Sequence, residues 1–387
     1  MSKIAISVIA FNRITSLKRL LESLEQGYYQ GEEVPLVISV DKSDTDAVEL
    51  FAERYQWHHG PKTVVKHREN MGLRRHILSQ GNLFEQYDAI IVLEDDIVVA
   101  PDFWNYAKQS ISKYEHNDEI AGISLYSFAV NYHLRQPFTP MHDKHDAYFM
   151  NCAMSWGQLW MKRQWRAFET WYNEHLAFPT TDLLPHSIQS WGEKSWLKYH
   201  TRYCIEQNKY FVFPYISYTT NFSETGTHIN ERVTLYQVPL LHGHKEFLSL
   251  PDFGSDAVYY DGFFENKALY KILGFTEEEC CLDLSNSSET SQGKRYWLTR
   301  KQLPYKVIKE FDFGFRPIEE NIINGCEGHG IYLYDTTIPA KRPENNNRIV
   351  FLSSFYILNV FLFIREYGYI NVIKDFINVV KDKFNIK

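Results

Sequence analysis

The stretch Ala89-Ile-Ile-Val-Leu-Glu-Asp-Asp-Ile-Val-Val-Ala-Pro-Asp-Phe103 joins a continuous apolar run to three consecutive carboxylates. An apolar run of strand length that is bounded by charge is typical of a central strand covered on both faces. Three adjacent acids repel one another unless a cation or hydroxyl groups compensate their charge. Mg²⁺ and Mn²⁺ prefer such hard oxygen ligands and keep open positions for substrate phosphates. The stretch therefore predicts a strand that ends at a metal-bound diphosphate, and the alternative is an acidic turn before a helix that Pro101 opens.

Strand and helix patterns alternate around this stretch over the first 130 residues. Strands are expected at 4–11, 34–40, 63–66 and 89–93, and helices at 17–24, at 47–55 and from about Gly72 onward. Repeated strand–helix–strand units predict an α/β fold, with a mostly parallel sheet and helices on both faces. Ligands of such sheets lie at the carboxyl ends of the strands. The polar residues at those ends are the candidates: Asn12 and Arg13, Asp41, 67–70 and 94–96.

Composition and charge argue against several classes of protein. The 387 residues are 44% hydrophobic and 23% charged, which is an ordinary globular composition with room for two or three domains. The formal charge of −7 argues against a nucleic-acid binder, which would carry a basic surplus. No Cys-x-x-Cys pair suggests a zinc ribbon, and the first strand lacks the features of a secretion signal. We therefore expect a cytoplasmic protein.

Several segments resemble the nucleotide-sugar domain of GT-A glycosyltransferases, and among these the N-acetylglucosaminyltransferase I family (glycosyltransferase family 13). The first three are Ser7-Val-Ile-Ala-Phe-Asn-Arg13, Ile38-Ser-Val-Asp41 and Glu94-Asp-Asp-Ile-Val-Val-Ala-Pro-Asp-Phe103. Ser155-Trp-Gly157 with Trp160, then 191–196, then Pro214–Phe222 with Gly226 and His228 follow in the family's order. The resemblance covers roughly residues 3–230 and implies a Rossmann-like GT-A fold, with a bacterial member expected.

The resemblance also implies roles for the acidic triplet. Asp96 would bind Mn²⁺, or Mg²⁺ in its place, and the metal would hold the diphosphate of a UDP-sugar donor. Asp95 would reach the ribose, and Glu94 would reach the donor sugar.

Other strand-end residues are expected around the nucleotide. By the same resemblance Arg13 and Asp41 would contact the nucleotide, and His76 would lie near it. Asn70-Met-Gly-Leu73 resembles a stretch common in bacterial glycosyltransferases at the donor site, which would place Asn70 there. Structural readings remain open for each: a surface helix-entry residue for Arg13, a turn or N-cap for Asp41, a solvated helix position for His76, and a turn at 70–72.

Inverting transfer needs a carboxylate that takes the proton from the acceptor hydroxyl. In the family this acid directly follows a Trp, whereas here Trp191 is followed by Gly192 and the acid comes one position later. Glu193 is the expected base and Asp182 the reserve, and the alternative for Glu193 is a salt bridge at a helix start. His228 would contact the diphosphate or metal, or would be a core histidine.

The sequence also predicts how the chain divides into domains. We expect a glycosyltransferase domain over 1–240, with a nucleotide-sugar half at about 1–130 and an acceptor half at about 131–240. Residues 241–345 form an extension of unassigned role, with a surface loop at 285–293 and a linker at 338–347. The aromatic-rich, amphipathic 346–387 is expected to be helical, either as a hairpin on a membrane surface or packed on its own domain or on a second subunit.

The expected activity is metal-dependent transfer of a sugar, with N-acetylglucosamine as the expected one, from a UDP donor to a glycan hydroxyl with inversion. The acceptor would be a glycan or a lipid-linked glycan in bacterial surface polysaccharide synthesis, at the inner face of the plasma membrane. Two alternatives are an inactive glycan-binding or scaffold subunit and a sugar-nucleotide nucleotidyltransferase. The second would show a Gly-rich basic loop where Asn12-Arg13-Ile14-Thr15 stands. The oligomeric state is left open.

Overall fold

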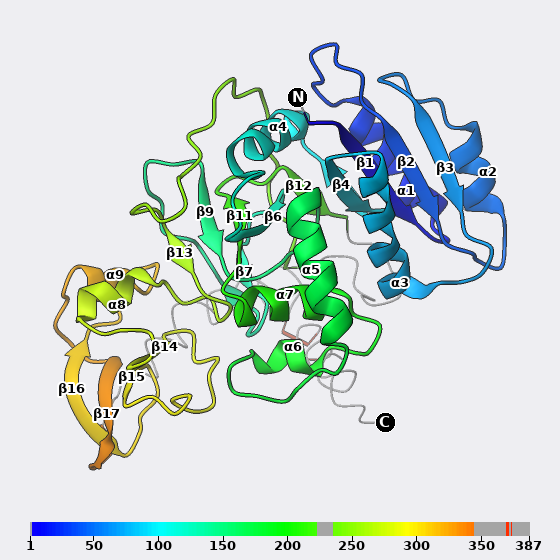
Figure 1. Cartoon of the computed structure of the whole chain (residues 1–387). Helices are drawn as coiled ribbons and strands as arrows, with labels where there is room; N and C mark the ends of the chain where they lie inside the picture. The colour runs from blue at the N-terminus through cyan, green and yellow to red at the C-terminus, as the bar shows by residue number, and fades with distance from the viewer. Residues whose placement is uncertain (1, 223–234, 344–368, 371–372, 374–387) are drawn as a thin grey trace.

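The computed structural model describes residues 2–222, 235–343, 369–370 and 373 (Figure 1). A nine-stranded sheet in the order β13-β9-β11-β6-β10-β4-β1-β2-β3 forms the centre of the main unit. Its strands are β1 (Ile4–Ala10), β2 (Leu36–Val40), β3 (Lys62–Lys66), β4 (Ala89–Glu94), β6 (Ile120–Ser124), β9 (Ala147–Met150), β10 (Gln158–Met161), β11 (Tyr210–Pro214) and β13 (Tyr259–Tyr260). The four strands expected in the first hundred residues are therefore confirmed.

The sheet is mostly parallel, as the repeated strand–helix units predict. Strands β1 to β4 share one direction with β6 and β11, whereas β10, β9 and β13 run the opposite way. Strand β10 lies between β4 and β6 and is antiparallel to both, with Gln158 opposite Val92. The chain that enters β10 consequently starts at the edge of the sheet where β4 ends.

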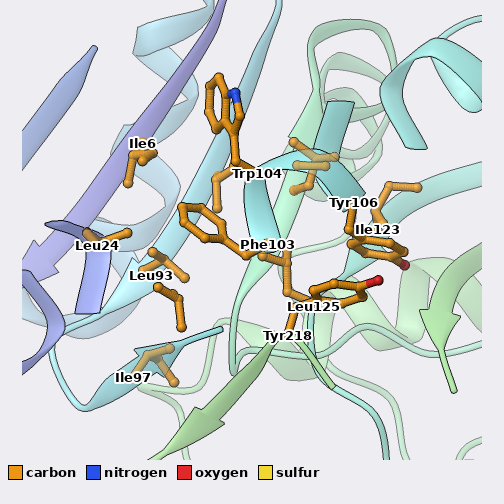
Figure 2. Close-up of a cluster of buried hydrophobic side chains, with 14 of the residues drawn as sticks. Ile6, Leu24, Leu93, Ile97, Phe103, Trp104, Tyr106, Ile123, Leu125 and Tyr218 are labelled. Carbon is orange, nitrogen blue, oxygen red and sulfur yellow. The ribbon is translucent and has the colours of Figure 1, made fainter. Parts of the chain in front are cut away.

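Successive strand residues point to opposite sides of the sheet, so a continuous apolar strand gives both faces apolar side chains. Helices cover both of these faces. The helices of the main unit are α1 (Ile14–Glu25), α2 (Ala47–Arg54), α3 (Gly72–Ser79), the 3₁₀ helix η1 (Gln80–Glu85), α4 (Phe103–Tyr114), α5 (Lys162–Glu174), α6 (His186–Ser190) and α7 (Leu197–Glu206). On one face Ile6 and Leu93 pack with Leu24 of α1 and Phe103 of α4 (Figure 2). The strand residues that alternate with these point to the other face. There they form a second hydrophobic core with residues of α3, α5 and α7.

Smaller sheets complete the structure. Strands β5 (Ile97–Val99) and β12 (Thr219–Asn221) form an antiparallel pair, as do β7 (Val130–Asn131) and β8 (Gln136–Pro137). A four-stranded sheet in the order β14-β15-β17-β16 comprises β14 (Cys280–Asp283), β15 (Tyr296–Thr299), β16 (Tyr305–Phe311) and β17 (Ile331–Pro339), and is accompanied by α8 (Ala268–Leu273) and α9 (Glu320–Ile323). In Figure 1 this small sheet lies on the opposite side of the molecule from β1 to β3.

Two expected boundaries are wrong. The main sheet continues past residue 240, because β13 pairs in parallel with β9 and Leu248 and Leu250 pack on the core. The linker expected from 338 begins later, since Ile338 and Pro339 still belong to β17. The expected tail at 346–387 lies outside the described residues apart from 369–370 and 373. In the part of the chain that the structure describes, no helix has the length and apolar character needed to cross a membrane.

A buried carboxylate joins the small sheet to the main unit and gives the stability a pH dependence. Glu265 is 2% exposed and accepts hydrogen bonds from the Ser285 N–H at 2.9 Å and hydroxyl at 2.5 Å. Burial, together with the charges of Asp261 and Asp283, raises the pKa of Glu265 to about 8. Between about pH 4.5 and 8 the folded chain therefore holds a proton that the unfolded chain has lost. The free energy of unfolding consequently falls as pH rises through that window.

We expect Glu265→Gln to remove this contribution, because the amide keeps an acceptor oxygen for Ser285 and carries no charge. The slope should change by at most about 1.4 kcal/mol per pH unit. Urea unfolding at several pH values between 4.5 and 8.5 measures it, with the exposed Glu327→Gln as the matched control. Parallel curves for the wild type and Glu265→Gln would contradict the expectation.

Candidate active site

The acidic triplet lies at the carboxyl end of β4, next to the end of β1. Glu94 is the last residue of β4, and its register partner on β1 is Ile9. Asp95 and Asp96 form the turn into β5, and the Asp96 carbonyl accepts a hydrogen bond of 2.7 Å from the Phe222 N–H, just after β12. The Asp95 side chain is 6% exposed and that of Asp96 is 30% exposed. Asp96 is therefore the more accessible of the two aspartates.

Arg13 brings a positive charge from β1 onto the triplet. It lies directly before α1, and its guanidinium donates to Asp95 and, at 3.3 Å, to Oδ2 of Asp96. The two strands are adjacent and parallel, so their ends bring together residues that are 82 and 83 positions apart. Arg13 does stand at the entry of α1, but its side chain is mostly covered and ion-paired, which differs from a surface residue.

The triplet carries more negative charge than one arginine neutralises. Burial, followed by the charges of Asp96 and Asp95, raises the pKa of Glu94 to about 8. Burial also raises the pKa of Asp95 to about 6, and the Arg13 charge only partly offsets this. Among the described residues no group of three His, Cys, Asp or Glu side chains could hold a metal by itself. A divalent cation bound to Asp96 would therefore take further ligands from substrate and water, as Mg²⁺ commonly does.

Asp41, at the end of β2, holds the loop that leads into α3. It is 4% exposed, and its carboxylate accepts hydrogen bonds from the N–H groups of Met71 at 2.8 Å and Gly72 at 3.0 Å. Asn70, which is exposed, donates to the Lys42 carbonyl at 3.0 Å. Gly72 has φ of 70°, a backbone conformation that favours glycine. The geometry fits the turn readings of Asp41 and Asn70.

His76 is buried between β2 and α3, so the reading as a solvated helix position is wrong. It is 2% exposed, and its Nε2 lies 2.8 Å from the hydroxyl of Ser39. His67 approaches the same hydroxyl at 3.1 Å, and Gln80 links it to Ser7 of β1. Burial lowers the pKa of His76 to about 4, so the ring is neutral at pH 7. This polar network links α3 and the start of η1 to β1 and β2.

The two candidate bases lie on the segment that joins α5 to α7. Glu193 stands in the turn before α7 with its side chain 87% exposed, 3.9 Å from Nζ of Lys198. This ion pair fits the salt-bridge reading of Glu193, although its length and the exposure of the carboxylate keep its contribution to stability small. Lys198 itself is 3% exposed and donates to the Trp191 carbonyl at 3.2 Å. Asp182 is exposed and accepts a hydrogen bond of 2.8 Å from Thr290 of the small sheet's loop.

Trp156 and Gly157 lie where the chain enters β10. Gly157 has φ of 98°, and a Cβ there would meet the Thr219 side chain at 2.7 Å, so only glycine fits. The Thr219 hydroxyl donates to the Trp156 carbonyl at 2.5 Å. The Trp156 ring packs against Tyr126 and Tyr236, with ring centroids 4.9 and 5.1 Å apart. His228 and Gly226 lie outside the described residues.

Sequence reasoning missed Lys198, Tyr126 and Tyr236. Lys198 lies in an ordinary helical pattern, and nothing in its sequence context marks a buried ammonium that holds the Trp191 carbonyl. Aromatic residues make up 16% of the chain, so nothing in the sequence singles out these two tyrosines. The nearest available signal was Trp156, whose aromatic partners could be named only once the fold had placed them.

Comparisons with known proteins agree with the motifs. Residues 1–170 match the model of the GNT-I family. S. aureus TarS 1–349 in complex with UDP-GlcNAc is 14% identical with a TM-score of 0.40, over 58% of this chain and 60% of that one. GalNAc-T7 with UDP, GalNAc and Mn²⁺ is 16% identical with a TM-score of 0.38, over 55% and 43%. The mannosyltransferase PcManGT from Pyrobaculum calidifontis, with GDP-Man and Mn²⁺, is 13% identical with a TM-score of 0.34, over 56% and 57%. The matched part spans about three-fifths of TarS 1–349. The family match over residues 1–170 agrees with the resemblance noted in the sequence, and the fold is of the expected α/β class.

Proposed function

We propose that this chain, whose residues 1–170 are glycosyltransferase sequence of the GNT-I family, is a metal-dependent transferase that uses a UDP-sugar donor. The observation that carries the proposal is the cluster of Arg13, Asp95 and Asp96 at the adjacent ends of β1 and β4. An open α/β sheet binds its ligands at this edge. N-acetylglucosamine as the sugar and transfer with inversion are the expectations that the family name supports.

The exposed carboxylate of Asp96 would hold Mn²⁺ or Mg²⁺, and the bound metal would neutralise the charge that builds on the leaving diphosphate. Asp95 would contact the ribose, and Glu94 the donor sugar. Arg13 would contact the nucleotide while keeping the aspartates in place.

Asp41, Asn70 and His76 would shape the nucleotide side of the site. Asp41 and Asn70 fix the loop before α3, and neutral His76 on α3 contacts Ser39 of β2. These residues therefore act mainly by holding backbone in position.

Glu193 is the proposed general base, because its carboxylate is exposed and stands two residues after Trp191. Lys198 fixes the Trp191 carbonyl and so positions the turn. The acceptor would be a hydroxyl of a glycan or lipid-linked glycan in bacterial surface polysaccharide synthesis, with 346–387 as the segment that meets the membrane.

Calorimetric titration of UDP and UDP-N-acetylglucosamine, with and without Mn²⁺, tests the donor site. We expect metal-dependent binding in the wild type and a loss of at least about 100-fold in affinity in Asp96→Ala, since a metal ligand is removed. Asp118→Ala is the matched control, because Asp118 is exposed and stands before the amino end of β6, whereas the triplet stands at the carboxyl end of β4, which runs in the same direction. Absence of UDP binding by the wild type in both metal conditions would overturn the proposal and favour the scaffold alternative.

A further inference from the structure

A hollow lies between the main unit and the loop of the small sheet, apart from the acidic triplet. Its volume is about 150 Å³, and it is lined by two stretches, 180–189 and 287–292, together with Phe263. Leu184 and Phe263, which are 2% and 8% exposed, supply apolar surface. Thr180, Asp182, Ser287 and Gln292 are among the polar residues that surround it. The hollow therefore combines an aromatic ring and an aliphatic side chain with many hydrogen-bonding groups.

The two stretches are held firmly, so the hollow is formed before any ligand enters. The Gln189 amide donates to the carbonyls of Thr181 at 2.8 Å and Leu184 at 2.7 Å, and accepts from the Thr181 N–H at 3.0 Å. Across the hollow, the Thr290 hydroxyl donates to Asp182 at 2.8 Å and accepts from the Gln292 N–H at 3.0 Å. A preformed site loses less entropy on binding.

Buried groups anchor these stretches from behind. Asp283, the last residue of β14 and fully buried, accepts a hydrogen bond of 2.8 Å from the Ser288 N–H. His133 contacts the Ser187 hydroxyl of α6 at 2.5 Å and the Gly262 carbonyl at 2.8 Å. Burial lowers the pKa of His133 to about 4, so it bridges α6 and the Phe263 loop as a neutral ring. The small sheet thus presents its loop to α6 in a fixed position.

The lining chemistry favours a neutral ligand with many hydroxyl groups. No Lys or Arg occurs among the lining residues, all of which lie in the described part of the chain, and the lining carries Asp182 and Glu289 beside His186, so a phosphate or nucleotide would meet two carboxylates and no permanent cation. A volume of about 150 Å³ is also below the roughly 300–1,000 Å³ of pockets that enclose a drug-sized ligand. Hydroxyl, amide and carboxylate partners beside an aromatic ring suit one sugar residue.

We propose that this hollow binds a sugar residue of the acceptor glycan at a distance from the residue that receives the transferred sugar. The inference rests on the proposed function. Its link to that function is the chain itself, because α6 lines the hollow and ends at Ser190, and Trp191 and the proposed base Glu193 follow directly. The proposal therefore assigns Asp182, which the sequence suggested as the reserve base, to the acceptor subsite.

Binding of the labelled full-length protein to an array of bacterial surface oligosaccharides, without donor, tests the proposal. Thr180→Trp places a large ring into the hollow from an exposed position, and Gln292→Ala removes an amide. We expect the wild type to bind a subset of the oligosaccharides and both variants to lose about tenfold or more in affinity. Thr170→Trp, an exposed position on α5, is the matched control and should bind as the wild type does.

Calorimetry with UDP on the same proteins separates this proposal from the previous one. UDP binding that is unchanged in Thr180→Trp, together with loss of oligosaccharide binding, supports the subsite. Loss of oligosaccharide binding in a protein that never binds UDP supports the subsite and refutes the donor proposal. Oligosaccharide binding that Thr180→Trp leaves intact, or UDP binding without binding of any oligosaccharide, overturns the subsite.

Discussion

Replacing Glu193 with Gln is expected to lower the transfer rate by about 10²–10⁴-fold, which is the usual contribution of a general base. The amide keeps the size of the side chain and removes its ability to accept the acceptor's proton. UDP affinity should remain close to that of the wild type, because Glu193 forms no hydrogen bond or ion pair with Arg13 or the acidic triplet within the described residues. Single-turnover transfer with saturating donor measures the chemical step separately from binding.

Asp182→Asn is the comparison that decides between the two candidate bases. In the structure Asp182 accepts a hydrogen bond from Thr290 across the hollow that is proposed to bind the acceptor, so its replacement should raise the KM for acceptor and leave kcat within a few-fold. A large fall in kcat for Asp182→Asn with little change for Glu193→Gln would show that the base had been assigned to the wrong residue.

Replacing Arg13 with Met is expected to destabilise the folded protein by about 1–3 kcal/mol, because it leaves a buried carboxylate without its partner. Asp95 is 6% exposed at its side chain, and Arg13 provides its ion pair. The guanidinium is 28% exposed, which keeps the expected loss below that of a fully buried pair. Urea unfolding without metal measures the free energy of unfolding.

The double variant Arg13→Met/Asp95→Asn completes a double-mutant cycle. We expect it to recover much of the stability lost in Arg13→Met, since the neutral amide no longer needs a counter-charge. UDP binding should remain weak in the double variant, because the proposed nucleotide contact of Arg13 is still missing. Additive losses across the cycle would show that the two side chains do not depend on each other.

The first half of the fold could be predicted because its signals are local. Leu17, Leu20, Leu21 and Leu24 mark one face of α1, and all four are fully buried. The apolar run at 89–93 is a central strand between β10 and β1. Parallel strands end at the same edge of the sheet, so Arg13 and the triplet could be expected at one edge, whereas the pairing of β4 with β1 and not with β3 does not follow from sequence order. The antiparallel insertion of β10 could not, because its four residues carry no local mark of their partners.

The surroundings of Glu193 and the hollow could not be predicted, because they depend on contacts between distant segments. Glu193 could be named only from its position after Trp191, and its exposure became clear with the turn before α7. The hollow joins residues about 110 positions apart, as the bond from Thr290 to Asp182 shows. His76 was misjudged in one reading because helical spacing shows which residues share a face but not what covers that face.

The anchoring of the 287–292 loop within its own small sheet has an evolutionary consequence. Asp283 and Lys301 hold the Ser288 backbone from inside that sheet, whereas Arg13 and Asp41 depend on the ends of β1, β2 and β4. Substitutions in the loop therefore leave the supports of the acidic triplet and of the loop before α3 unchanged. If the loop contacts the acceptor as proposed, proteins descended from this chain could change acceptor by substitution of a few loop residues and keep the proposed donor site.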